Sequence, residues 1–378
     1  MRHGVHAVPA GSASPVPGPD GRLRRGWTTG ACATAATKAA YGALLGLGFP
    51  TAVSLRLPRG HEAAFALAEA TLAPDRSSAT AGVVKDAGDD PDVTHGCLVR
   101  ATVRHAAVGS GVVFRAGEGV GTVTRPGLPI PPGEPAINPV PRATLRAVVA
   151  ELAGAAGTAG DVEITLAIPG GEALAAKTLN GRLGSMGGLS ILGTTGIVVP
   201  YSCSSWIHAI HRGIDVARAA GLRHVAAATG SVSERAVAEL YRLPEMALID
   251  MGDFVGGTMK YLRRHPVPQV SVAGGFAKLL KLAQGHLDLH SSRSTVDLAR
   301  LSGVLGEAGA PRGVVTAVRT APTAAEALEI CAAGGIDVAS LVAERARQVA
   351  QAEAGEAVRV EVIVFGRDGR LAGRADGW

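Results

Sequence analysis

The chain has 378 residues, more than one hydrophobic core usually supports, so we expect two domains. Hydrophobic residues make up 47% of it and aromatic residues only 3%, so Ala, Val, Leu and Ile must form the cores. The net charge is +5, and the positive side chains are scattered. This pattern disfavours nucleic-acid binding, which needs a concentrated basic patch with aromatic platforms. It fits either a polyanionic small-molecule ligand or an arginine-rich solvated surface.

The cysteines and the N-terminal segment also exclude some classes. Cys32, Cys97, Cys203 and Cys331 form no CxxC pair, which argues against a structural zinc site. Residues 1–21 are rich in Pro, Gly and Ser and are expected to form a disordered tail. The sequence has no signal-type apolar segment and no charge-free apolar run of about 18 residues, so we expect a cytoplasmic protein without contact to a membrane.

Residues 22–141 are predicted to form an α+β domain. Thr28 or Thr29 can cap a helix whose Ala-rich body ends near Gly46. The stretch 117–142 holds too many glycines and prolines for regular structure, but its Val, Leu and Ile indicate a packed loop. We place the domain boundary just after this loop. Strands with alternating hydrophobicity are predicted at residues 51–58, 61–73 and 97–106.

Residues 142–378 alternate between strand and helix patterns, which predicts an α/β domain with a mostly parallel, Rossmann-like sheet. A helix at 142–156 opens this domain. The last predicted strand, 358–366, follows a long helix at 338–355. The other predicted strands are residues 162–168, 223–229, 246–252, 268–274 and 314–320, the last of them before a helix at 323–335.

Glycine-bearing loops follow several of these strands. Ligands of parallel sheets bind where loops leave the carboxyl ends of the strands, and glycine loops offer backbone N–H groups to an anionic or polar ligand. Neither a GxGxxG in its strand–turn–helix setting nor a GxxxxGK[ST] occurs, which argues against a Walker-type NTPase. The expected ligand-binding residues are Gly193, Thr194, Thr195, Gly196, Thr229, Gly230, Ser231, Gly274 and Gly275.

Residues 85–96, KDAGDDPDVTHG, concentrate acidic side chains around one histidine. The aspartates could hold Mg²⁺ or Ca²⁺, and Asp89, Asp90 and His95 could form a transition-metal site. Alternatively, the aspartates shape turns and Asp92 or Thr94 caps the next element. From the residues alone, both alternatives stay open.

A second segment, 285–297, raises the same question. His286, Asp288 and His290 alternate, so in an extended stretch they could point to one side as two histidines and one carboxylate. The alternative is a loop that contacts a ligand, with Arg293 and its neighbouring serines as donors to carboxylates.

Several long segments together resemble the cobalt-precorrin-5B C(1)-methyltransferase family (CbiD) of the anaerobic cobalamin pathway. They occur in order from about Leu23 to the C-terminal helices, so the resemblance covers nearly the whole chain. The segments are LRRGWTTGACATAATKAA, KDAGDDPDVTHG, GEGVGTVTRPGL, GEPAINPVPR, GGLSILGTTGIVVPYS and GHLDLHSSRSTVD.

The resemblance implies methylation of carbon 1 of cobalt-precorrin-5B by S-adenosylmethionine, giving cobalt-precorrin-6A. Cobalt would then arrive within the substrate, and no protein metal is needed. The glycine loops would bind S-adenosylmethionine. His95, Asp90 and Asp89 would face the active cleft as catalytic groups, with His95 as an acid or base. The expected substrate-binding residues are Thr28, Thr29, Arg125, Arg142, His286, His290 and Arg293.

The arginines among them suit a corrin precursor, because a guanidinium pairs with acetate and propionate carboxylates in a bidentate manner. The expected partners are the cobalt tetrapyrrole and, transiently, neighbouring enzymes of the pathway, without nucleic acid. A non-catalytic binder or chaperone of a cobalt tetrapyrrole is the main alternative, and a metal-dependent hydrolase is a distant third. Release of S-adenosylhomocysteine separates the enzyme from the binder.

Overall fold

The computed structural model describes residues 23–378, so the expected disordered tail at 1–21 lies outside the described residues. The chain divides into two compact units, one ending at Ser202 and the other spanning Cys203–Trp378. In the described part of the chain, no helix is both long and apolar enough to cross a membrane.

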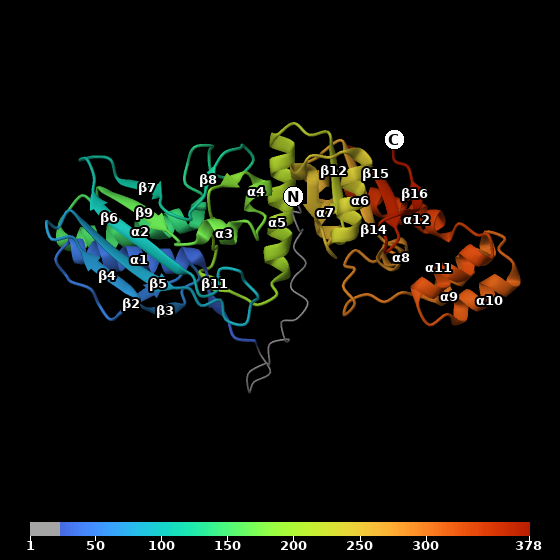
Figure 1. Ribbon diagram of the computed structural model, residues 1–378, viewed down its shortest axis with the longest axis horizontal. Helices are drawn as coiled ribbons and strands as arrows, with labels where there is room; N and C mark the ends of the chain where they lie inside the picture. The colour runs from blue at the N-terminus through green and yellow to red at the C-terminus, as the bar shows by residue number, and fades with distance from the viewer. Residues whose placement is uncertain (1–22) are drawn as a thin grey trace. The chain divides into compact units, whose positions relative to one another are not determined.

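The N-terminal unit is built around a helix that is buried on all sides (Figure 1). Helix α1, Thr29–Leu44, buries every residue except Lys38. Its Ala, Gly and Thr side chains are small, so α2 (Pro139–Ala156) and the sheet can approach its backbone closely. Thr28 caps α1 by accepting a hydrogen bond from the Ala31 N–H at 3.2 Å, and this helix was correctly predicted.

The main sheet of this unit has the strand order β4-β5-β6-β9-β7. Strands β5, β6 and β9 pair antiparallel, and β7 lies parallel to β9. A separate hairpin, β2-β3, follows α1 along the chain. The strands of the unit are β1 Gly26–Trp27, β2 Ala52–Arg56, β3 Glu62–Ala66, β4 Glu69–Leu72, β5 Ser78–Val84, β6 Leu98–His105, β7 Val112–Ala116, β8 Thr122–Val123, β9 Val162–Ala167, β10 Ser185–Met186 and β11 Ile197–Val198.

The predicted domain boundary near residue 142 is wrong, because α2 and β9 belong to the N-terminal unit. Helix α2 packs on α1, and β9 pairs with β6 and β7 instead of opening a parallel sheet. Two short helices, α3 (Gly171–Ala175) and α4 (Asn180–Leu183), follow β9. The loop at 117–142 is packed as expected: Val123, Ile130 and Ala136 form a small core of their own.

The C-terminal unit contains a five-stranded sheet in the order β13-β12-β14-β15-β16. All neighbouring strands are parallel except β16, which runs antiparallel to β15. The strands are β12 His224–Ala228, β13 Leu248–Asp250, β14 Gln269–Gly275, β15 Arg359–Phe365 and β16 Leu371–Ala375. The mostly parallel sheet confirms the α/β prediction at this level.

The Rossmann-like assignment does not extend to the strand order. In the dinucleotide-binding Rossmann sheet the first strand lies between the second and the fourth. Here the first strand, β12, lies between the second, β13, and the third, β14. This is the order of the other common doubly wound sheet.

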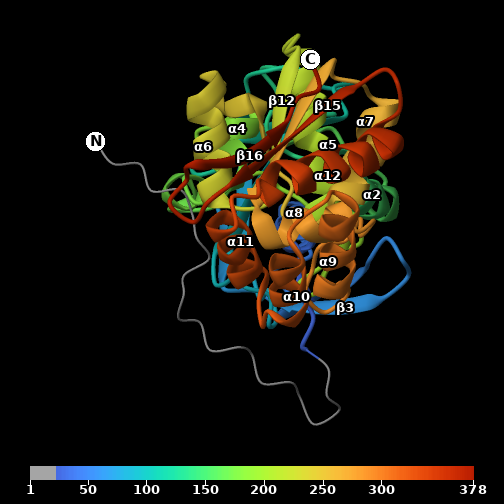
Figure 2. The ribbon, with the colours of Figure 1, turned by 90° about the vertical axis from the view of Figure 1, so that its right-hand side faces the viewer.

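Helices cover both faces of this sheet, as alternation along its strands shows (Figures 1 and 2). Val225 and Ala227 pack with α5, α7, α8 and α12, whereas Ala226 and Ala228 pack with α6. Helices α9, α10 and α11 group together beside α8 and α12. The helices are α5 Cys203–Ala219, α6 Ser231–Tyr241, α7 Val255–Arg264, α8 Phe276–Ala283, α9 Leu298–Glu307, α10 Arg312–Thr320, α11 Ala324–Ala333 and α12 Val338–Ala354, with a 3-10 turn at Glu245–Ala247.

One predicted strand of this unit, 314–320, is the helix α10. Pro311 is its N-cap residue. Val314, Val315 and Val318 recur at helical spacing, and a short apolar run of this kind is compatible with either structure. Packing against α9 and α11 selects the helix.

Candidate functional site

The carboxyl ends of β12 and β14 form the topological switch point of the C-terminal sheet. From β12 the chain leads first to β13 on one side and later to β14 on the other. Loops at such a point diverge and leave a crevice, which is where doubly wound proteins bind ligands. Here β12 leads through Thr229 and Gly230 into α6, which begins at Ser231, and β14 ends with Gly274 and Gly275 directly before α8. We call these two segments the switch-point loops.

These two loops contact one another directly. The Thr229 N–H donates to the carbonyl of Ala273 at 2.9 Å. A Cβ on Gly274 would lie 2.7 Å from the Thr229 hydroxyl, so glycine is required for this close approach. A Cβ on Gly230 or Gly275 would have no neighbour within 4 Å, so there is free space at both positions. The two loops therefore combine tight mutual packing with an open outer side.

A lysine joins these loops to a third one. The Lys278 ammonium, on α8, donates to the carbonyl of Thr229 at 2.7 Å and lies 3.0 Å from the Asp253 carboxylate. Asp253 follows β13, so the loops after β12, β13 and β14 meet at this ion pair. Its members are 39% and 23% exposed, so the pair borders solvent. Sequence reasoning missed both residues, although Asp253 directly follows the glycine of a predicted strand end.

The predicted glycine loop at 193–196 does not follow a strand of this sheet, because it lies in the N-terminal unit. Its carbonyls cover the start of α1: the Thr28 N–H donates to Gly196 at 3.0 Å. A Cβ on Gly193 would lie 2.2 Å from the Thr28 hydroxyl, and one on Gly196 would lie 2.8 Å from Leu57. The glycines are thus required for packing, and the grouping with Thr194 and Thr195 as part of one strand edge is wrong.

Thr28 and Thr29 have the same local explanation. Thr28 is the N-cap of α1, and the Thr29 hydroxyl accepts a hydrogen bond from the Leu192 N–H at 2.9 Å. A cavity of about 130 Å³ lies beside them, lined in part by Gly30 and Gly193. Pockets for drug-sized ligands measure about 300–1,000 Å³, so this cavity is too small for a nucleoside cofactor.

The acidic loop at 85–96 is held together mainly by its own aspartates. Asp92 accepts from the buried Lys85 ammonium at 2.7 Å and from the Thr94 N–H at 2.8 Å. Burial opposes ionisation of Asp92, but Lys85 and the hydrogen bonds from Thr94 together outweigh it and lower the pKa. Asp86 pairs with Arg24, which lowers the pKa of Asp86. Turn shaping therefore accounts for these two aspartates.

Two of the three predicted catalytic residues also make backbone hydrogen bonds. Asp89 accepts from the Arg24 N–H at 2.5 Å, and Asp90 accepts from the Tyr201 N–H at 2.8 Å. Burial raises the pKa of Asp90. Through these contacts the loop fixes both the first described residues and the end of the N-terminal unit.

His95 has a different environment. Its Nδ1 accepts a hydrogen bond from the Ala87 N–H at 3.1 Å, whereas the Asp86 carboxylate lies 3.7 Å away, beyond hydrogen-bond distance. A ring nitrogen that accepts carries no proton, so the neutral ring carries its proton on Nε2. The side chain is 52% exposed. Among residues 23–378, no three His, Cys, Asp or Glu side chains are grouped as metal ligands, so the metal alternative has no geometric support.

The predicted substrate-binding arginines divide into two kinds. Arg142 is committed to its own unit: it donates to the carbonyls of Ile137 and Pro135 at 2.9 and 3.0 Å and pairs with Glu134 at 3.1 Å. This side chain is only 15% exposed, so the structure gives it a structural role. Arg125 is exposed, with only its aliphatic stem near Gly184.

The segment with His286, His290 and Arg293 lies against the third loop of the switch point. The Leu289 N–H donates to the Asp253 carbonyl at 2.9 Å. Within the segment, Asp288 accepts from Arg293 at 2.8 Å, and His290 Nδ1 lies 2.7 Å from the Ser292 hydroxyl. These local bonds shape a loop and do not form the two-histidine, one-carboxylate group. His290 and Arg293 remain at the border of the candidate site.

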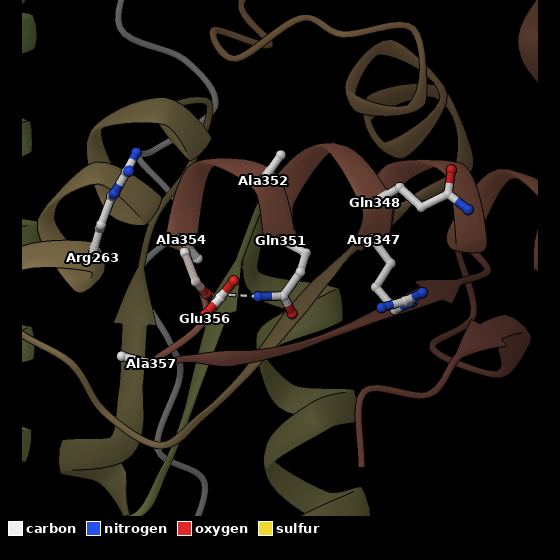
Figure 3. A pocket seen from close by; sticks show the side chains of 9 residues that line it. Arg263, Arg347, Gln348, Gln351, Ala352, Ala354, Glu356 and Ala357 are labelled. Atoms are coloured by element: carbon white, nitrogen blue, oxygen red, sulfur yellow. Dashed lines mark hydrogen bonds between the residues drawn. The ribbon is translucent and has the colours of Figure 1, made fainter.

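A larger cavity, of about 770 Å³, lies elsewhere in the C-terminal unit (Figure 3). It is lined by Arg263 of α7, Gln348 and Gln351 of α12, and the segment that leads into β15. Gln351 donates to the Gly355 carbonyl at 2.8 Å and so fixes this segment. Because the segment precedes β15, the cavity lies at the amino ends of the parallel strands, opposite the switch-point loops.

The sequence matches known proteins along both units. Residues 18–200 match the family model CbiD, and residues 288–376 match the model CbiD, C-terminal domain. A protein from Bradyrhizobium sp., named cobalt-precorrin-5B C(1)-methyltransferase, is 61% identical over 94% of both chains. Proteins with the same name from Rhodospirillum rubrum and Paramagnetospirillum magneticum are 58% and 57% identical over 93% of this chain and 97% and 98% of theirs.

A crystal structure of the cobalamin biosynthesis protein (cbiD) from Archaeoglobus fulgidus is 26% identical. The match covers 74% of this chain and 85% of that one, with a TM-score of 0.39. The named relatives identify the present chain as a methyltransferase. It belongs to the CbiD family.

Proposed function

We propose that this protein transfers a methyl group from S-adenosylmethionine to carbon 1 of cobalt-precorrin-5B, giving cobalt-precorrin-6A in cobalamin biosynthesis. The observation that carries the proposal is the similarity to relatives named for this reaction. The Bradyrhizobium protein is 61% identical over 94% of the chain. The switch point supports the same function, because doubly wound proteins bind small ligands at the carboxyl ends of the strands at such a point.

The residues at the switch point fit the methyl donor. Gly230 and Gly275 leave space beside the backbone. The first N–H groups of α6 and α8 are not used by the helices themselves, so they can donate to the polar groups of the cofactor. Lys278 holds the Asp253 carboxylate in place, where it would accept hydrogen bonds from polar groups of the cofactor. Thr229, Gly230, Ser231, Gly274 and Gly275 would thus hold S-adenosylmethionine.

Little covalent chemistry is required of the protein itself. When bound, S-adenosylmethionine supplies an electrophilic methyl carbon. The chain must hold the ring carbon in line with it, at near-attack distance, and exclude water. The carbon–carbon bond then forms as the carbon–sulfur bond breaks, and S-adenosylhomocysteine is released.

Of the three residues expected to be catalytic, we propose an acid–base role for His95 alone. Asp89 and Asp90 are occupied by backbone N–H groups. His95 is half exposed, and imidazole is the side chain best suited to exchange a proton near neutral pH. For Arg125, His286, His290 and Arg293, contact with the substrate also remains a proposal.

Methyl transfer under strict anaerobiosis tests the function. The purified protein, incubated with cobalt-precorrin-5B and S-adenosylmethionine carrying an isotope-labelled methyl group, should release S-adenosylhomocysteine and place the label at carbon 1. The substrate should first be shown to react with a related enzyme. If the protein binds the tetrapyrrole but releases no S-adenosylhomocysteine, the non-catalytic binder is the correct alternative.

A further inference from the structure

Trp206 exposes an aromatic face beside the switch-point loops. It lies in the first turns of α5, and 45% of the residue is exposed. Its indole N–H donates to the carbonyl of Asp250, the last residue of β13, at 3.0 Å. This bond fixes the ring at the carboxyl end of the strand that precedes Asp253. In a chain with only 3% aromatic residues, a fixed and half-exposed tryptophan at this position requires an explanation.

The inner side of the ring is closely packed. Gly252 has a φ of +56°, in the left-handed region, and a Cβ there would lie 3.3 Å from the indole. Phe254 lies behind the ring, with centroids 6.2 Å apart and planes tilted by 50°. The ring is therefore supported by Gly252 and Phe254 and held by one hydrogen bond, while nearly half of its surface stays open. A preorganised surface of this kind loses little entropy when a flat ligand stacks on it.

A positive charge lies near the same helix face. Cys203 precedes Trp206 by about one helical turn, so the two side chains share a face of α5. The Arg293 guanidinium lies 3.9 Å from the Cys203 sulfur and pairs with Asp288 at 2.8 Å. The Arg293 side chain is 59% exposed, so further donors of its guanidinium can reach a ligand.

We propose that Trp206 and Arg293 form the subsite for the tetrapyrrole: the indole stacks on the macrocycle, and the guanidinium binds a peripheral carboxylate. The assignment rests on the proposed function and names which residues receive its substrate. Both features match this occupant, because a corrin precursor is a broad conjugated ring with many carboxylates. S-Adenosylmethionine carries one carboxylate and two cationic groups, so it is the poorer partner for Arg293.

Two cobalt corrinoids serve as probes: cobyrinic acid, whose side chains are free carboxylates, and cobinamide, whose side chains are amidated. Replacing Trp206 with alanine should weaken binding of both by about 5- to 150-fold, the range for one aromatic stacking contact. Trp206→Phe should restore part of the affinity. Arg293→Gln should weaken binding of cobyrinic acid but not of cobinamide. Affinities are measured by calorimetry on the full chain.

Trp378 provides a matched control, because it is 38% exposed in the same unit but packs on His224 at the amino end of β12. Trp378→Ala should leave corrinoid affinity unchanged. Binding of S-adenosylhomocysteine should stay the same in Trp206→Ala, whereas its melting temperature should fall, because the Asp250 hydrogen bond and the packing on Phe254 are lost.

The outcomes separate this subsite from the proposed function. If wild type binds cobyrinic acid and Trp206→Ala binds it equally well, the subsite is wrong and the function stands. If Trp206→Ala instead loses its affinity for S-adenosylhomocysteine, the indole stacks on the adenine of the cofactor and the proposal is overturned. If wild type binds no corrinoid and methylates no cobalt-precorrin-5B, the proposed function fails, and the subsite fails with it.

Discussion

Asp90 and His95 lie in the same loop but make different kinds of contact. Asp90 accepts a hydrogen bond from the Tyr201 backbone, whereas His95 presents a half-exposed ring. The sequence could not separate them, because both residue types shape turns and both serve as acids or bases. The group opposite each side chain distinguishes the two roles, and the partner of Asp90, Tyr201, is distant in the sequence.

The first prediction uses substitutions that keep shape. In His95→Asn, the Asn oxygen can replace Nδ1 as acceptor for the Ala87 N–H, but it cannot exchange a proton. We expect turnover to fall by about 10²- to 10⁴-fold, as for loss of a general acid or base. The melting temperature should change by no more than a few degrees. Release of S-adenosylhomocysteine and thermal denaturation measure the two effects.

Asp90→Ala is the companion variant. It removes the acceptor for the Tyr201 N–H, so we expect a stability loss of about 0.5–2 kcal/mol, as for a lost cap. Turnover per folded molecule should be nearly unchanged. Full activity in His95→Asn would show that the histidine takes no part in the chemistry. Strong loss of turnover in Asp90→Ala would show that the Asp90 carboxylate does take part.

The second prediction concerns Lys85 and Asp92. The pKa of Asp92 is lower in the folded state than in the unfolded state, where it is near 3.9. Its contribution to stability is therefore fully present at pH values above the unfolded pKa. It is lost as the pH falls through the folded pKa. Lys85→Met removes one cause of the lowered pKa and leaves only the hydrogen bonds from Thr94 to oppose burial, so the pH dependence from this group should weaken. We expect Lys85→Met to be less stable than wild type at pH 7. On acidification, its free energy of unfolding should fall less than that of wild type.

Urea unfolding at several pH values between about 2 and 7 measures this effect. Breaking a buried ion pair costs about 3–5 kcal/mol, and the lower end applies because Asp92 is 25% exposed. Lys38→Met is the control, since its partner Glu151 is 60% exposed and the pair should contribute little. Parallel pH curves for wild type and Lys85→Met would contradict the assignment.

At the scale of elements, periodicity predicted most helices and strands but not their partners. The helix that became α1 and the parallel strands β12, β13, β14 and β15 are present where expected. The strand pattern at 162–168 was also real, but nothing local to it shows that it pairs with β6 and β7. Residues 314–320 form a helix, because packing against α9 and α11 decides between the two structures that a short apolar run allows.

The candidate site follows the same rule. The loops after β12 and β14 could be predicted, since consecutive parallel strands end at one edge. Lys278, Asp253 and Trp206 could not, because their roles depend on which loops lie side by side. The loop at 193–196 shows the converse error: its glycines match a ligand loop in composition, but they are required by contacts with Thr28 and Leu57.

The third prediction tests the switch-point loops. Gly275 is the N-cap residue of α8, and a side chain there would enter open space without steric conflict. Gly275→Val should therefore fold normally, but its side chain should fill the volume proposed for the cofactor. We expect the affinity for S-adenosylhomocysteine, measured by calorimetry, to fall at least tenfold. Gly303→Val is the matched control, because Gly303 in α9 also has no neighbour within 4 Å. If Gly275→Val and Gly303→Val bind S-adenosylhomocysteine with equal affinity, the cofactor does not bind at the switch-point loops.

At the scale of the whole molecule, the two units each have a large core. Val99, Leu145 and Ile164 belong to the core of the N-terminal unit, and Val270 and Val362 belong to the core of the C-terminal unit. The change near residue 142 from a loop-rich sequence to alternating strand and helix patterns therefore does not mark the domain boundary. It marks the point where α2 and β9 complete the first unit.

The fourth prediction follows from this boundary. Limited proteolysis should cut between residues 199 and 203, because Val199 and Tyr201 are 48% and 55% exposed and the two units divide there. Mass spectrometry should then find two protected fragments. Cleavage concentrated at 117–142 would instead favour the earlier boundary, but Val123 and Ile130 are buried in that loop and should protect it.

The pairing of β1 with β11 has a consequence for biosynthesis. Gly26 and Trp27 are among the first residues of the unit to leave the ribosome, and their partners Ile197 and Val198 are among the last. Closing so long a loop is slow. Strands β5 and β6 can cover one side of the alanine-rich α1 early, but the side that packs on α2 stays open until α2 emerges. A nascent chain that stops short of α2 therefore exposes part of its central helix, and chaperones that recognise apolar segments should bind it there.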